Sequence, residues 1–77
     1  SVPEILELVR TSENNRAYIA KYKGKDSSYY IYVFVSKKLK FKDTFATVVY
    51  GTNKDLKSSE LDKLADSFFN QVESFLR

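Results

Sequence analysis

The sequence contains no cysteine and no histidine. Without cysteine no disulfide and no thiolate metal site can form, which is compatible with a reducing compartment. The two absences also remove the commonest general base, the commonest metal ligand and the commonest activated nucleophiles. The only glycines, Gly24 and Gly51, stand far apart, so no glycine-rich phosphate-binding loop is present. We therefore predict a protein that is not an enzyme and that uses no metal and no other cofactor.

Long apolar runs are also missing. No run approaches the ~18 residues of a membrane-spanning helix, so we expect no membrane partner. The 77 residues predict a single domain over residues 1–77. No signal peptide is visible and residue 1 is not methionine, so we expect a cytoplasmic protein that is trimmed or cut from a longer chain.

Charge is unevenly distributed along the chain. Residues 16–57 hold ten lysines and arginines against three aspartates, a net charge of +7, whereas residues 1–15 and 58–77 each carry −2. A polarised molecule of this kind can present its basic side to a polyanion.

The N-terminal residues follow a helical pattern. Ser1 and Pro3 suit a helix start, with Glu4 as a capping-box acid. Val2, Ile5, Leu6 and Val9 then share one helical stripe. We therefore predict a first helix that fades over residues 11–15, where polar residues accumulate.

The middle of the chain favours strands over residues 16–23, 29–36 and 44–50. A turn over residues 24–28 separates the first two, and residues 37–43 either connect the last two or extend them into a twisted ribbon. A final helix follows, capped by Ser58 or Ser59 with Asp62 as box partner. Its apolar stripe comprises Leu61, Leu64, Ala65, Phe68, Phe69, Val72, Phe75 and Leu76. The sequence therefore predicts an α+β fold of order α-β-β-β-α, a three-stranded antiparallel meander with both helices packed on one face.

The central strand is apolar on both sides. Alternation places Tyr30, Tyr32 and Phe34 on one face and an aliphatic set on the other. The aliphatic set comprises Ile31, Val33 and Val35. Two short helices cover one face of such a sheet well, so we expect one apolar face to stay open and to bind a partner. We propose Tyr30, Tyr32 and Phe34 as that partner-binding surface; alternatively they form the core beneath the last helix and the aliphatic set faces outward.

Lysines flank the same strands. The candidate nucleic-acid-binding residues are Lys21, Lys23, Lys37, Lys38, Lys40 and Lys42. Lysine makes point-charge contacts with phosphates, so binding would follow the shape of the backbone rather than the base sequence. The alternative reading is a solvated turn whose lysines protect sheet edges from aggregation.

Two families of RNA-binding proteins share the predicted order of elements. The start of the last helix reads SSELDKLAD, which lacks the lysine cluster of the double-stranded-RNA-binding domain. The segments RAYIAKYKG, SKKLKFK, FATVV and SSELDKLADSFF resemble the small Alu-domain RNA-binding proteins of the signal recognition particle, although YGTNKDLK separates FATVV from the helix. The resemblance implies a sheet that binds folded RNA beside a sister subunit. In that arrangement the six candidate lysines would contact the phosphates.

Two functions therefore stand as hypotheses. The first is a small module that binds structured RNA through its lysines, as a homo- or heterodimer. The second is a protein–protein interaction or dimerisation domain of a larger protein, which docks through an open face of the sheet. The sequence alone leaves both open.

Overall fold

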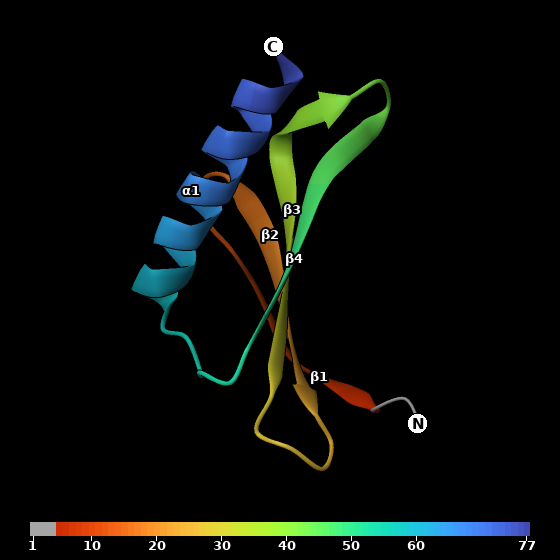
Figure 1. Ribbon diagram of the computed structural model, residues 1–77, viewed down its shortest axis with the longest axis vertical. Coiled ribbons are helices and arrows are strands. Elements are labelled where there is room, and N and C mark those ends of the chain that lie inside the picture. The colour runs from red at the N-terminus through yellow and green to blue at the C-terminus, as the bar shows by residue number, and fades with distance from the viewer. Residues whose placement is uncertain (1–4) are drawn as a thin grey trace.

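The computed structural model describes residues 5–77, which form a twisted antiparallel sheet with one helix lying across one of its faces (Figure 1). The elements are β1 (Leu6–Glu13), β2 (Ala17–Gly24), β3 (Tyr30–Phe41), β4 (Thr44–Thr52) and α1 (Ser58–Leu76). The strands lie in the sheet in sequence order, β1-β2-β3-β4, so each pairs with its neighbour along the chain. The described chain is thus a four-stranded meander followed by a helix.

The predicted order α-β-β-β-α and its three-stranded sheet are wrong, because residues 6–13 form an edge strand and not a helix. The physical reason is a β-bulge: the register of β1 against β2 shifts between Leu8 and Arg10. A bulge interrupts the alternation of side chains, so the apolar residues of this strand do not follow period two and imitate a helical stripe. The proposed helix start at residues 1–4 lies outside the described residues.

The register of β2 against β3 decides which side chains share a face. Tyr18 lies opposite Val35 and Ala20 opposite Val33, whereas the intervening Ile19 lies opposite Phe34. Residues directly opposite one another point to the same side of a sheet. The aromatic and aliphatic sets of β3 therefore belong to opposite faces, as the alternation predicts.

The β3–β4 hairpin is longer than the rest of the sheet. Strand β3 continues to Phe41, and the chain reverses at Lys42, whose φ of 57° is left-handed. The register shifts between Val35 and Lys40, where the Ser36 hydroxyl oxygen accepts hydrogen bonds from the backbone N–H groups of residues 38 and 39. The segment 37–43 therefore extends both strands into a ribbon, which is one of the two alternatives for this segment.

Helix α1 begins one residue earlier than its predicted caps. Lys57 is the N-cap residue, and its backbone N–H donates to the Glu60 side chain at 2.9 Å. Asp62, expected as a box partner, instead accepts a hydrogen bond from the Asn14 amide at 2.7 Å. Arg16 adds a second link, donating to the Asn70 side chain at 2.8 Å. These contacts tie the β1–β2 turn to the helix.

The core lies between α1 and the face of the sheet that carries the aromatic set. Its buried apolar residues are Ala17, Ile19, Tyr32, Phe34, Leu56, Leu61, Ala65 and Phe69. Phe34 meets Phe68 of the helix edge to face, with ring centroids 5.5 Å apart. Such aromatic contacts contribute beyond the area that they bury. The helix thereby fixes one face of the sheet and leaves the other to solvent.

Candidate interaction surface

The face of the sheet opposite α1 is uncovered, and we call it the open face. Its central residues are Tyr18, Ala20, Tyr22, Ile31, Val33, Val35, Thr47 and Val49. Val49 is 63% exposed and Tyr18 is 55% exposed, although both belong to residue types that pack well in sheets. The open face is therefore an apolar surface that spans β2, β3 and β4, and β1 extends it through the exposed Leu8, which lies opposite Tyr22.

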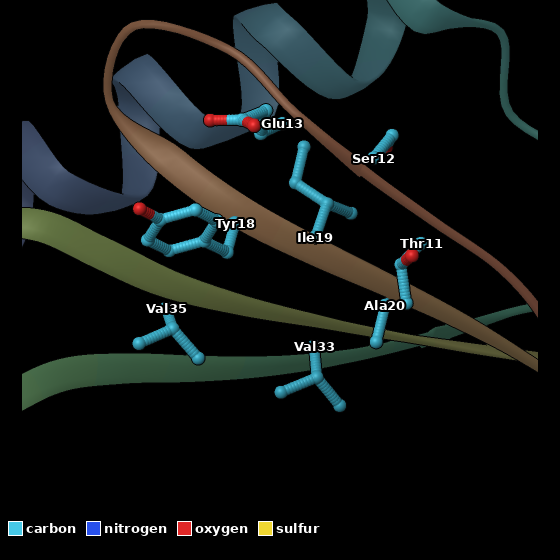
Figure 2. Close-up of a pocket in the computed structure, with 8 residues that line it drawn as sticks. All are labelled: Thr11, Ser12, Glu13, Tyr18, Ile19, Ala20, Val33 and Val35. Atoms are coloured by element: carbon cyan, nitrogen blue, oxygen red, sulfur yellow. The ribbon is translucent and has the colours of Figure 1, made fainter.

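The open face is shallowly hollowed toward β1. A groove of about 400 Å³ is lined there by Thr11, Glu13, Tyr18, Ala20 and Val33, among others (Figure 2). Figure 2 shows Val33 and Val35 side by side, next to the Tyr18 ring. The lining offers alkyl groups, one aromatic ring, the hydroxyls of Thr11, Ser12 and Tyr18, and a single carboxylate. Such a surface suits an apolar side chain and has few groups that could orient a small polar substrate.

The charges on this face neutralise one another. Lys37 forms an ion pair with Glu13, and its ammonium also lies 4.8 Å from the centroid of the Tyr18 ring. Thr11, Ala20, Val33 and the other central positions are uncharged. The open face therefore repels neither an apolar surface nor a second copy of itself.

Tyr30, Tyr32 and Phe34 lie on the covered face, beneath α1. Tyr32 and Phe34 are fully buried, and Tyr30 is half-buried. The hydroxyl oxygen of Tyr32 accepts a hydrogen bond from the Leu56 backbone N–H at 2.8 Å, which fixes the segment before α1. This arrangement matches the alternative in which the three rings form the core and the aliphatic set faces outward.

Lys21, one of the predicted phosphate contacts, is also on the covered face. Its side chain is only 8% exposed and forms an ion pair with Asp55, and its ammonium lies 5.0 Å from the centroid of the Tyr30 ring. The hydrogen bond from Lys21 lowers the pKa of the Asp55 carboxyl below its ordinary value, with a smaller contribution from the positive charge of Arg10. Lys21 thus acts within the fold and is poorly placed to meet an external phosphate.

The remaining candidate lysines are divided between the two ends of the sheet. Lys23 pairs in register with Tyr30 at one end of β3, whereas Lys38, Lys40 and Lys42 lie at the other end. Lys37 belongs to the second group but is engaged by Glu13. The structure therefore brings four of the six residues to one end of the sheet, three of them without an ion pair in the described chain, and separates Lys21 and Lys23 from them.

Val49 and Thr47 were not predicted as surface residues from the sequence. The signal was present, because TFATVVY over residues 44–50 alternates and the face of Val49 follows from the register with Val33. That register was not available from the sequence. It depends on the pairing of two strands, which local periodicity does not define.

No cluster of acidic side chains that could hold a metal ion occurs within residues 5–77. In the same range, no helix is long and apolar enough to cross a membrane. Comparison with protein-family models, with curated proteins and with solved structures found no match to this chain. The resemblance to the signal recognition particle proteins stays a prediction from sequence, and the described order β-β-β-β-α differs from the α-β-β-β-α order that accompanied it.

Proposed function

We propose that this chain is a non-enzymatic protein interaction module that forms a homodimer by stacking two copies open face to open face. The observation that carries the proposal is the exposure of apolar side chains on that face, among them Val49 of the edge strand β4. In a domain of this size, uncovered apolar surface on one whole face of the sheet is a substantial loss of burial. Exposed apolar patches of this extent commonly mark interaction sites.

The dimensions of the face suit a second copy. Four strands about 4.8 Å apart, each about seven residues long with a rise of ~3.3 Å per residue, give a face of roughly 20 by 23 Å. Two such faces bury on the order of 900 Å² before the relief of the side chains is counted, which brings the total near the lower end of stable interfaces. Stacked sheets pack about 10 Å apart and interdigitate through small branched residues such as Val33, Val35 and Val49.

Charge supports the same partner. A two-fold dimer places the same patch on both sides, so any net charge on the patch would face its own sign. Here Glu13 and Lys37 neutralise each other within one copy. The described open face therefore has no unbalanced charge that would oppose a second copy.

RNA binding through the lysines receives less support from the same geometry. Lys21 and Lys37 are engaged with carboxylates, and Lys23 lies away from the other candidates. A cytoplasmic location is part of the proposal, and the absence of cysteine is compatible with it.

The test is the molar mass in solution across a concentration series, by sedimentation equilibrium. The wild-type chain is expected to shift from monomer to dimer as its concentration rises. Val49→Glu places a charge on the open face, opposite Val33, and is expected to weaken dimerisation at least tenfold, since a buried unpaired charge costs several kcal/mol.

The matched control is Phe75→Glu, which makes the same kind of change at an exposed residue in the last turn of α1. It should leave the dimer constant unchanged, and circular dichroism should show both variants folded. A wild-type chain that stays monomeric at the highest attainable concentration contradicts the proposal. So does a dimer that Val49→Glu leaves intact.

A further inference from the structure

The end of the β3–β4 hairpin extends beyond the rest of the sheet, and we call residues 38–45 the ribbon tip. The last residue of β3 that pairs with β2 is Ser36, so the strands of the tip pair only with each other. Figure 1 shows this hairpin and the C-terminal end of α1 at the same end of the molecule. The tip is therefore accessible from several sides.

Two phenylalanines occupy the ribbon tip. Phe41 is 64% exposed and Phe45 is 43% exposed. With Val72 and Leu76 of α1 they line an apolar hollow of about 440 Å³. Phenylalanine carries no polar group that water can satisfy, so each exposed ring loses the burial that a core position would give. A partner that covers these rings must offer an apolar environment.

Three lysines belong to the ribbon tip, and two of them lie beside these rings. The ammonium of Lys40 lies 5.5 Å from the centroid of the Phe45 ring, and that of Lys42 lies 5.6 Å from the centroid of the Phe41 ring. Lys38 is exposed on the same strand. In contrast to Lys21 and Lys37, these three have no ion pair within residues 5–77. Asp43 is the one acid in the sequence of the tip, so its net charge is positive.

We propose that the ribbon tip is a peripheral binding site for an anionic lipid bilayer surface. The lysines would meet the headgroup phosphates and carboxylates, while Phe41 and Phe45 enter the boundary between headgroups and acyl chains. Each ring lies beside an ammonium group. This arrangement matches a bilayer surface, in which charged headgroups lie a few ångströms above the apolar acyl chains. This contact needs no membrane-spanning segment. The expectation of no membrane partner was based on the absence of long apolar runs, so it does not apply to a contact at the bilayer surface.

A folded RNA is the other polyanion that these lysines could meet. The aromatic rings favour the bilayer. Bases stack on the flat faces of rings, but one face of the Phe41 ring already carries the Lys42 ammonium, and one face of the Phe45 ring that of Lys40. A bilayer requires only the ring edges to enter.

The test is co-sedimentation of the chain with vesicles of phosphatidylcholine, with and without phosphatidylserine. Binding is expected only with phosphatidylserine and should weaken as salt is added. The triple variant Lys38→Gln, Lys40→Gln, Lys42→Gln is expected to bind roughly 100-fold more weakly, at about a fivefold loss per lysine. The matched control is Lys25→Gln, Lys54→Gln, Lys63→Gln, which removes the same charge elsewhere and should lose much less affinity.

Insertion of the rings is tested by fluorescence, because the sequence contains no tryptophan. Phe41→Trp should shift its emission to the blue when phosphatidylserine vesicles are added, whereas Lys25→Trp, in the β2–β3 turn, should not. The proposal is overturned if phosphatidylserine gives no added binding, if the two triple variants bind equally, or if Phe41→Trp shows no shift. Tighter binding to a structured RNA than to vesicles, lost in the tip variant, also overturns it and restores the RNA hypothesis. None of these readouts depends on dimerisation, so this proposal and the homodimer can fail separately.

Discussion

The two faces of the sheet are built from the same strands but have different chemical character. The covered face presents large rings, with Tyr32 and Phe34 fully buried beneath Phe69 and its neighbours in α1. On β3 and β4 the open face presents small branched side chains, of which Val33 and Val49 are typical, and its rings, Tyr18 and Tyr22, lie on β2. Both faces are apolar, so hydrophobicity alone does not decide which one the helix covers.

The difference follows from shape. A helix of 19 residues is about 29 Å long and about 10 Å wide, so α1 is shorter than the 12-residue strand β3, which is about 40 Å long, and covers only about two strand spacings of the width of the sheet. Its closest approach to the sheet is to β3 and β4, although Ala17 and Ile19 of β2 also belong to the core beneath it. Large rings on those strands contact the convex surface of the helix and fill the space on either side of it. The valines on the other face form a flatter surface, which can pack against another sheet.

The largest expected difference between the faces is in the cost of removing a side chain. Phe34→Ala empties a fully buried site in contact with Phe68 and should lower the free energy of unfolding by about 3–5 kcal/mol. Since domains of this size are stable by only ~4–12 kcal/mol, much of the variant should be unfolded at moderate urea concentration. Urea titration followed by circular dichroism measures the change. A loss below about 1 kcal/mol would mean that the ring is not held beneath α1.

A sharper comparison uses two adjacent valines of β4 that point to opposite faces. Val48 packs against the core, and Val49 lies on the open face. In dilute protein, where the monomer predominates, Val48→Ala should cost about 1–2 kcal/mol and Val49→Ala less than about 0.5 kcal/mol. Both variants lose the same two methyl groups, so each is the control for the other.

Protein concentration extends this comparison to the proposed dimer. Binding of a second copy stabilises the folded state by mass action, so the cost of Val49→Ala should grow as the concentration rises while the cost of Val48→Ala stays constant. Equal costs of the two substitutions at every concentration would contradict the distinction between a covered face and an open face that binds a second copy.

The covered face could be predicted from the sequence to a large extent. Periodicity indicated the last helix, including its buried Leu61, Ala65 and Phe69, and the alternation of β3 separated its two sets of side chains. The first strand could not be recognised. Its bulge at Leu8 breaks the period of two, and the pairing with β2 that stabilises it joins distant residues.

The candidate sites were predictable only in part. Lys38, Lys40 and Lys42 were recognised because they are adjacent in sequence and remain together in the ribbon. The burial of Lys21 was not recognised, since it depends on Asp55, far along the chain, and on the position of α1. Which side chains share the open face likewise depends on the register of three strands, which the sequence does not define.

The smallest expected effect concerns the ion pair at the edge of the covered face. Because the folded pKa of Asp55 is lowered, its carboxylate stabilises the fold above the unfolded pKa of about 3.9, and this contribution fades as the pH falls through the lower folded value. Asp55 itself is well exposed, so solvent limits the effect. Asp55→Asn should therefore be less stable than the wild type near neutral pH, and the difference should shrink toward acidic pH.

Urea unfolding at a series of pH values measures that difference. The control is Asp26→Asn, which makes the same change in the β2–β3 turn, where residue 26 has no ion pair within the described chain. Its stability difference should be small at neutral pH and should vary little. Lys21→Met tests the other partner of the ion pair, because it replaces the buried ammonium by an apolar chain of similar length. It should abolish the same pH dependence of stability that Asp55→Asn removes. If Asp55→Asn loses as much stability at acidic pH as at neutral pH, the contribution of Asp55 does not come from its charge, and the ion pair with Lys21 is not what stabilises this edge of the covered face.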